Sequence, residues 1–177
     1  MNAQDKLNKT ESTERTKDND NQATEETSSF CTFWVGEALH GVRIQDVLEI
    51  NKETQITPIF HVPEEILGYV NLRGQVYLIL DLGLILGQKK KKEISPENRL
   101  VIFKSEVGES FGVLVDRIDD ILEVPMDRFE SAQGFTPAGQ NEETRFLLQG
   151  VCKLEEKLLV VLNSRSIFRY MEQKNAA

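Results

Sequence analysis

The chain has 177 residues and a formal net charge of −8, from 21 Lys and Arg against 29 Asp and Glu. This length allows one domain, or two small ones that share a core, without a disulfide or a metal to hold them together. The acidic balance argues against a nucleic-acid partner, because binding to phosphates depends on clustered Lys and Arg. One basic cluster, residues 89–92, follows Gly87 and is predicted to be an exposed loop.

Cysteine usage and the N-terminus indicate a reducing compartment. Cys31 and Cys152 lie far apart and have no Cys-x-x-Cys spacing, so we expect two small buried core residues rather than metal ligands or a disulfide. The N-terminus is polar and shows no secretory leader. The longest apolar run, residues 76–86, contains Asp81 and is too short to cross a bilayer. We therefore expect a cytoplasmic protein with no direct membrane insertion.

Residues 1–29 form a separate compositional region. They contain seven acidic and four basic residues, and hydrophobic side chains are rare among them. Such a segment cannot bury enough apolar area to offset the entropy of an ordered chain. We predict a disordered, polar and acidic tail over 1–29, a folded domain over 30–171, and a flexible C-terminus over 172–177.

The folded part opens with short apolar runs that are separated by glycine. Residues 30–35 and 39–42 are predicted strands with a turn between them. The spacing of the apolar residues at 44–48 then predicts a helical turn or two. Residues 63–68 have Pro at the start and Gly at the end, which predicts a single helical turn that ends at Gly68.

A tight hairpin is the clearest local prediction. Two apolar runs, 69–72 and 75–80, are separated only by Arg73-Gly74, and glycine supplies the positive φ that such a turn needs. Residues 100–103 and 111–116 are expected to pair as further strands. A strand over 118–124 should stop at Pro125.

The last third of the chain predicts a second hairpin and a closing helix. Residues 131–144 are rich in Gly, Gln, Thr and Glu and are expected to form a mobile loop. The runs 147–154 and 157–162 bracket a turn, and Asn163 can cap a helix with Ile167 and Phe168 inside. Many short strands indicate an all-β protein, and the hairpin-rich parts, about 30–88 and 97–162, suggest two intertwined small barrels.

Residues able to carry catalysis are not grouped in this sequence. His40 and His61 have no partner at ligand spacing, and the glycines form no phosphate-binding fingerprint. Asp116, Asp119 and Asp120 leave a metal site or an acidic hydrolase open as an alternative, although the exposed face of a sheet explains them better. We expect no enzyme activity, no cofactor and no metal, and a protein that presents surfaces to other proteins.

A longer pattern resembles a known family. The run 68–76, Gly-Tyr-Val-Asn-Leu-Arg-Gly-Gln-Val, followed by Leu80-Asp81-Leu82, closely resembles the CheW-domain signature. Similar agreement extends over about 30–170, in the segments 41–50, 111–122 and 150–162. The chain departs from the family pattern at Phe60-His61, at Leu78 and at Gly83, where proline or arginine is usual.

The resemblance implies two packed five-stranded SH3-like barrels with a groove between them, short helical turns and a C-terminal helix. It also implies a non-catalytic chemotaxis adaptor that couples chemoreceptor (methyl-accepting) cytoplasmic tips to the regulatory domain of a CheA-type histidine kinase, recruited to membrane-associated receptor arrays. A CheW-like scaffold of a non-flagellar pathway, for pilus motility or development, is the alternative. A β-barrel nucleic-acid binder would need a basic face studded with aromatic residues, which the acidic balance opposes.

The same resemblance assigns five protein-binding positions. Each also has a structural interpretation: Val47 and Ile121 suit a core, Gly68 suits the end of a helix, and Glu49 with Arg73 suits an exposed ion pair. Arg73 has the strongest functional case, because burial gives no reason for an arginine at the tip of a turn. The predicted sites for receptor or kinase are Val47, Glu49, Gly68, Arg73 and Ile121.

Overall fold

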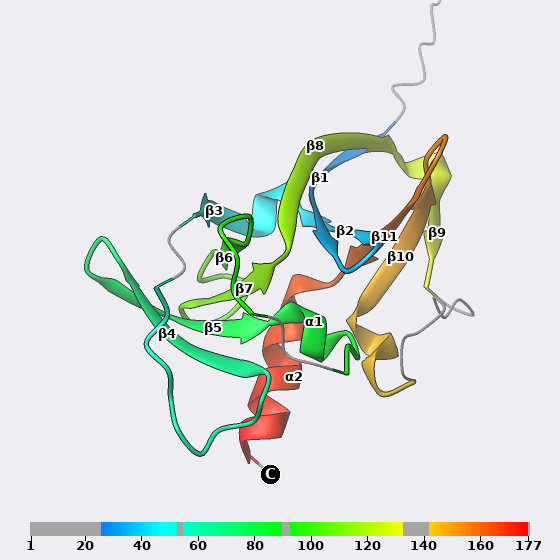
Figure 1. Cartoon of the computed structure of the whole chain (residues 1–177). Coiled ribbons are helices and arrows are strands. Elements are labelled where there is room, and N and C mark those ends of the chain that lie inside the picture. The colour runs from blue at the N-terminus through cyan, green and yellow to red at the C-terminus, as the bar shows by residue number, and fades with distance from the viewer. Residues whose placement is uncertain (1–25, 53–54, 90–92, 133–141, 177) are drawn as a thin grey trace, which may run out of the picture.

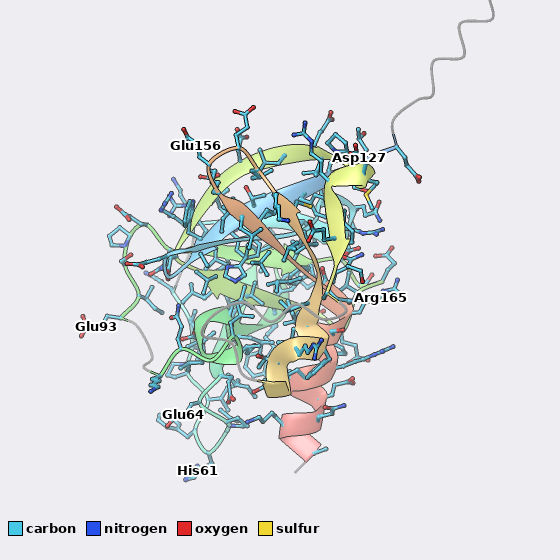
Figure 2. The ribbon with its side chains drawn as sticks, turned by 90° about the vertical axis from the view of Figure 1, so that its right-hand side faces the viewer. His61, Glu64, Glu93, Asp127, Glu156 and Arg165 are labelled. Carbon is cyan, nitrogen blue, oxygen red and sulfur yellow. The ribbon has the colours of Figure 1, made fainter. Side chains whose placement is uncertain are left out.

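The computed structural model describes residues 26–52, 55–89, 93–132 and 142–176. The strands of the described residues form two β-sheets, and the C-terminal helix α2 (Ser164–Ala176) lies beside the β4–β5 part of the structure (Figure 1). Polar and charged side chains mark both ends of the molecule: Asp127 and Glu156 lie at one end, and His61 and Glu64 lie at the other (Figure 2). The predicted loop over 131–144 falls mainly outside the described residues.

The first sheet has six strands in the order β8-β1-β2-β11-β10-β9. Neighbouring strands are antiparallel except β2 and β11, which run parallel with Leu39 opposite Leu159. The strands are β1 (Thr27–Val35), β2 (Ala38–Arg43), β8 (Arg117–Pro125), β9 (Phe129–Ser131), β10 (Leu148–Lys153) and β11 (Leu158–Leu162).

The second sheet has five strands in the order β3-β6-β7-β5-β4. Only β5 and β7 are parallel neighbours in it. The strands are β3 (Val47–Asn51), β4 (Ile66–Leu72), β5 (Gln75–Asp81), β6 (Arg99–Phe103) and β7 (Phe111–Val115). Helix α1 (Leu82–Ile85) follows β5, because the Asp81 carboxylate accepts a hydrogen bond from the Leu84 N–H at 3.1 Å and caps it. Short 3-10 turns span Ile44–Asp46, Met126–Arg128 and Glu142–Leu147.

The mostly-β fold with short helical turns and a C-terminal helix is confirmed, and strands from the two parts of the chain are interleaved in both sheets. One sheet has six strands rather than five, and each sheet takes strands from both 30–88 and 97–162. β1 and β2 pair with β8 and β11, while β6 and β7 lie between β3 and β5. Apolar alternation identifies a strand, but it does not identify the partner, which depends on contacts between distant segments.

Both ends of the domain extend further than the sequence predicted. β1 begins at Thr27, inside the predicted tail, because it pairs with β8 from Thr27 opposite Pro125. Helix α2 continues to Ala176, so residues 172–176 are helical and not a loose end. Residues 1–25 of the predicted tail lie outside the described residues.

The predicted helical turn over 63–68 is wrong, and the residue responsible is Gly68. It lies within β4, where a bulge separates Ile66 from Gly68 in the pairing with β5. Its φ is +143°, and a Cβ atom there would lie 2.0 Å from the carbonyl oxygen of Thr57. Thr57 and Tyr69 exchange two backbone hydrogen bonds at 2.8 and 2.9 Å, which hold that approach in place. Gly68 is therefore required by a close backbone contact and not by the end of a helix.

Among the described residues, buried apolar side chains form three clusters. The central cluster takes side chains from both sheets, and each of the two others belongs to one sheet. Alternation on β6 produces this division: Val101 and Phe103 face the central cluster, and Leu100 and Ile102 face the cluster of the five-stranded sheet. Each sheet thus curls around a core of its own and packs against the other through a shared core, consistent with two SH3-like barrels.

Candidate protein-interaction site

The β4–β5 hairpin carries the residue with the strongest sequence-based case. Leu72 pairs with Gln75, which leaves the predicted two-residue turn Arg73-Gly74. Both turn residues have positive φ, +52° and +86°, as a type I′ turn requires. The Gly74 N–H donates to the Asn71 side-chain oxygen at 2.9 Å and fixes the bend. The Arg73 side chain, 84% exposed, therefore stands at the tip of a firmly held turn.

An ion pair joins this turn to β3. The Arg73 Nη1 atom lies 3.1 Å from Glu49 Oε2, and Glu49 also accepts a hydrogen bond from Asn51 Nδ2 at 3.3 Å. β3 and β4 are the two edge strands of the five-stranded sheet, so the pair connects opposite edges of a curled sheet. Exposed ion pairs contribute about 0–1 kcal/mol to stability. Stability alone therefore gives little reason for this arrangement.

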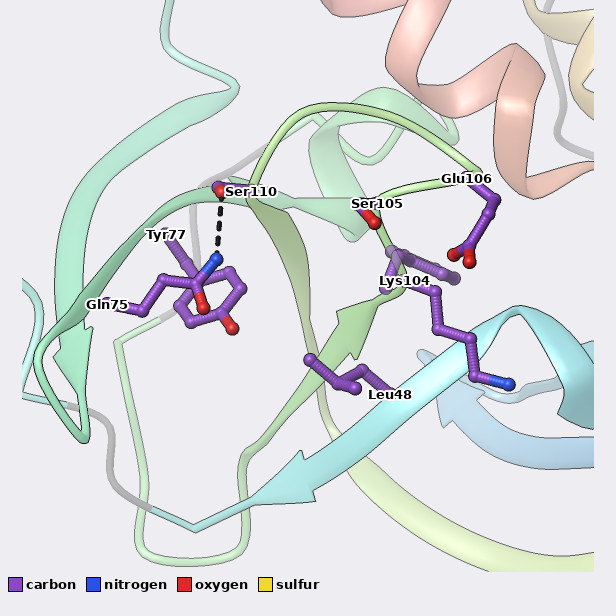
Figure 3. Close-up of a pocket in the computed structure, with 8 residues that line it drawn as sticks. Leu48, Gln75, Tyr77, Lys104, Ser105, Glu106 and Ser110 are labelled. Atoms are coloured by element: carbon purple, nitrogen blue, oxygen red, sulfur yellow. Dashed lines mark hydrogen bonds between the residues drawn. The ribbon is translucent and has the colours of Figure 1, made fainter.

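Apolar side chains are exposed next to the ion pair. Leu48 and Ile50, which flank Glu49 on β3, are 51% and 41% exposed. Leu48 borders a pocket of about 330 Å³ between β3, the start of β5 and the β6–β7 turn, where Gln75 Nε2 donates to Ser110 Oγ at 3.2 Å (Figure 3). The pocket is lined by Leu48, Gln75, Tyr77, Phe103, Lys104, Ser105, Glu106 and Ser110. Leu48 and Ile50 are not among the positions predicted from the sequence, although their i, i+2 spacing is a strand signal.

Two of the five predicted positions do not face solvent. Val47 is 8% exposed and belongs to the central core, where it pairs with Phe103 across β3 and β6. Gly68 is buried against Thr57. Val47 anchors β3, which carries Glu49, in the core, and Gly68 allows the close backbone approach of Thr57 to β4, which leads to Arg73. Neither has a side chain that a partner protein would touch in this conformation.

Ile121 faces solvent on the other sheet. It lies on β8 opposite Cys31, and 56% of it is exposed. It is therefore not a core residue, which was the alternative interpretation. The structure brings Glu49 and Arg73 together and puts Ile121 on a different sheet.

The aspartates considered for a metal site are held by hydrogen bonds from the protein. Asp119 accepts from the Trp34 indole N–H and from Lys157 Nζ, both at 3.0 Å, and Arg117 lies 3.9 Å away. The pKa of Asp119 lies below its ordinary value, first because of the Trp34 hydrogen bond and then because of the two cations. Asp116 accepts from the Gly36 N–H at 2.7 Å. Within the described residues, no group of three or more His, Cys, Asp or Glu side chains could hold a metal ion.

The other candidate residues are buried inside the sheets. Cys31 and Cys152 are free buried thiols, as predicted for core residues, and burial raises the pKa of Cys31 to about 11. His40 lies within β2 and is buried. Burial lowers the pKa of His40 to about 4, so its imidazole is neutral at physiological pH.

Comparison with known proteins agrees with this geometry. A family model described as the CheW-like domain matches residues 29–172. This chain belongs to the CheW family of chemotaxis coupling proteins. The chemotaxis protein CheW of Rhizobium meliloti (strain 1021) is 33% identical over 145 residues, which is 81% of this chain and 89% of that protein.

Two further similar proteins cover most of the chain. Protein FrzA of Myxococcus xanthus is 32% identical over 160 residues, covering 84% of this chain and 94% of its own. The crystal structure of the scaffolding protein TtCheW from Thermoanaerobacter tengcongensis superposes with a TM-score of 0.68 at 26% identity, covering 77% of this chain and 89% of that one. In the described part of this chain, no helix has the length and apolar character needed to cross a membrane.

Proposed function

We propose that this protein is a non-catalytic chemotaxis adaptor that couples the cytoplasmic tips of chemoreceptors to the regulatory domain of a CheA-type histidine kinase. The observation that carries the proposal is the Glu49–Arg73 pair, which lies within the residues that the family model matches and joins the signature turn to β3. An adaptor of this kind acts by geometry, because it holds the kinase where the receptor can bias its activity. The protein would work in the cytoplasm, recruited to membrane-associated receptor arrays.

The surface around the pair has the composition of a binding site. Arg73 presents a guanidinium with five N–H donors, and Leu48 and Ile50 add exposed apolar area beside it. A few apolar anchors with a charged neighbour can carry most of the affinity of an interface. Glu49 and Arg73 would be contact residues, and Val47 and Gly68 would be positioning residues that set their strands.

Ile121 supplies a second exposed apolar position on the other sheet. An adaptor must bind two partners at once, which requires two surfaces that do not overlap. We assign the Glu49–Arg73 surface and the Ile121 surface to different partners, one to the receptor and one to the kinase.

Reconstitution tests the proposal. A receptor-tip fragment and a CheA-type kinase are mixed with and without the purified full-length protein, and kinase autophosphorylation is followed. We expect the protein to raise receptor-dependent kinase activity and to bind each partner separately. Binding to neither partner would overturn the proposal.

A matched pair of variants makes this experiment specific. Arg73→Glu removes the cation of the Glu49–Arg73 pair, and Lys153→Glu removes the cation of an exposed pair with Glu130 at 2.8 Å on the six-stranded sheet. Because both changes reverse one exposed charge, general electrostatic effects should be alike. We expect Arg73→Glu to impair coupling and Lys153→Glu to leave it unchanged.

A scaffold of a non-flagellar chemosensory pathway is a second candidate. The observation that supports this second candidate is the similarity to Protein FrzA over 84% of this chain, because that relative does not carry the CheW name. Deletion of the gene distinguishes the two. Loss of swimming chemotaxis supports the first candidate, and loss of surface motility or development with normal swimming supports the second.

A further inference from the structure

A second depression lies between the β4–β5 hairpin and helix α2. It has a volume of about 540 Å³, and its lining includes none of the five residues that the sequence predicted as binding sites. We call it the β4–β5/α2 groove. Its elements lie side by side in Figure 1. The lining residues are Tyr69, Val76, Leu78, Ser105, Glu109, Ser110, Phe168, Met171 and Glu172.

Both faces of the hairpin carry apolar side chains. Tyr69 pairs with Leu78, and Val76 pairs with Asn71, so the side chains of these residues share one face. The opposite face, including Val70 and Tyr77, fills the core of the five-stranded sheet. On the groove side Tyr69 is 45% exposed and Val76 is 51% exposed. In an antiparallel hairpin with one buried face, the solvent-facing positions are usually polar. The exposed Tyr69 and Val76 depart from that pattern.

The helical wall of the groove is fixed in place. Phe168 of α2 packs against the Phe111 ring with centroids 5.1 Å apart. It also packs against Gly108 of the β6–β7 turn, where a Cβ atom would lie only 2.4 Å from the ring. Met171, one helical turn further on, completes the wall. The groove is therefore preformed, which lowers the entropic cost of binding.

The rim of the groove is acidic. Glu109 and Glu172 both line it and both are exposed, whereas no Lys or Arg is among the lining residues. Arg165 and Arg169, although on α2, do not line it. Among the described residues neither glutamate takes part in an ion pair. An apolar floor between two available carboxylates is complementary to apolar side chains flanked by cations.

We propose that the β4–β5/α2 groove binds an amphipathic helix of a partner protein, with apolar residues at i, i+3 or i+4 and i+7 and with flanking Lys or Arg. An added strand is disfavoured, because the edge of β4 at Tyr69 already bonds through both its N–H and C=O to Thr57. The inference does not depend on the proposed adaptor function.

Charge decides against two other occupants. Residues 1–25 of the same chain carry six acidic and four basic side chains, so they would meet the rim with a net negative charge. A second copy related by a two-fold axis through the groove would bring Glu109 and Glu172 against their own equivalents. The whole chain also carries −8, which adds to the repulsion between copies.

Selection from a peptide library tests this inference on the full-length protein. Random peptides of about 16 residues, long enough for about four helical turns, are selected on the wild type and counter-selected on Val76→Glu. We expect the enriched peptides to carry apolar residues at helical spacing with Lys or Arg beside them. Enrichment of acidic peptides, or no peptide that prefers the wild type, would overturn the inference.

Variants assign the binding site of the selected peptides. Val76→Glu should weaken binding about tenfold or more, and Ile94→Glu, at another exposed apolar residue (42% exposed), should not change it. The double reversal Glu109→Lys with Glu172→Lys should weaken basic peptides and favour the same peptides with Glu in place of Lys and Arg. A basic peptide with the same affinity for the wild type and the double variant would contradict the proposed charge complementarity. If these results hold while the kinase reconstitution fails, only the adaptor proposal is lost.

Discussion

The guanidinium of Arg73, in the turn that follows edge strand β4, lies 3.1 Å from the carboxylate of Glu49 on the opposite edge strand, β3. The sheet must curl for its edges to meet, and the 84% exposure of Arg73 leaves most of its side chain open to a partner. The pair is therefore both a consequence of the fold and an accessible charged feature on its surface. If the pair serves mainly the fold, its removal should lower stability, whereas if it serves binding, its removal should lower coupling.

Removal of Arg73 should separate function from stability. We expect Arg73→Ala to weaken kinase coupling and to change the free energy of unfolding by no more than about 1 kcal/mol, as for other exposed pairs. Glu49→Lys should have the same effect on coupling, because it places two cations together. Kinase assays and thermal melts of the same preparations measure the two effects. A large loss of stability in Arg73→Ala would favour the purely structural role.

The double variant Glu49→Arg with Arg73→Glu is the sharper control. It restores an ion pair with its direction reversed, so we expect the melting temperature to recover. Coupling should remain impaired, because the partner would meet a carboxylate where the wild type presents a guanidinium. Recovery of coupling in the double variant would show that the pair matters only for the fold.

Gly68 and Gly74 should respond very differently to alanine. Both have positive φ, +143° and +86°, but a Cβ at Gly68 would lie 2.0 Å from the Thr57 oxygen, whereas nothing lies within 4 Å at Gly74. Gly74→Ala should cost about 1–2 kcal/mol from its backbone conformation alone. Gly68→Ala should cost more, because the contact with Thr57 must also be broken. Denaturant unfolding measures both, and equal losses would contradict the close-contact explanation.

Local chemistry allowed part of this fold to be predicted from sequence. The hairpin at Arg73-Gly74 was predictable because a two-residue turn between apolar runs has few solutions. The start of α2 was predictable because Asn163 can cap it, and its side chain accepts from the Ser166 N–H at 3.1 Å. Family resemblance added Glu49, which no local pattern would single out.

The remaining features depend on contacts between distant segments. The sequence around Gly68 predicted the end of a helix. Glycine is instead required there by the carbonyl of Thr57, which lies on another segment of the backbone and which local sequence does not reveal. Pairing of Trp34 with Asp119 joins β1 to β8 across 85 residues of sequence, which no spacing rule reveals. The exposure of Ile121 and the burial of Val47 likewise follow from which sheet each strand joins.

His40 should make stability depend on pH. Its pKa is lowered from 6.5 to about 4 by burial, so the unfolded chain takes up a proton before the folded chain does. Stability should therefore be fully present above pH 6.5 and should fall as the pH drops from 6.5 towards 4, by about 3 kcal/mol at most. Urea unfolding across this range should give a shallower slope for His40→Gln than for the wild type. Equal slopes would contradict the burial effect.

The final turns of α2 should depend on Glu65. This side chain is 18% exposed and accepts hydrogen bonds from Tyr170 Oη at 3.1 Å and from Lys174 Nζ at 3.3 Å, so it ties the helix to the segment before β4. Glu65→Ala removes both bonds and leaves the Tyr170 hydroxyl without its acceptor. We expect amide hydrogen exchange to become faster in the last two turns of α2, while the core strands keep their protection.

Two variants separate the contributions to this contact. Tyr170→Phe removes one neutral donor, and Lys174→Met removes the exposed cation, 48% of whose side chain faces solvent. Because the Lys174 pair is largely screened by water, we expect Lys174→Met to have the smaller effect on exchange and Tyr170→Phe an intermediate one. Unchanged exchange in Glu65→Ala would mean that packing of Ile167, which is fully buried, holds the helix as far as its end.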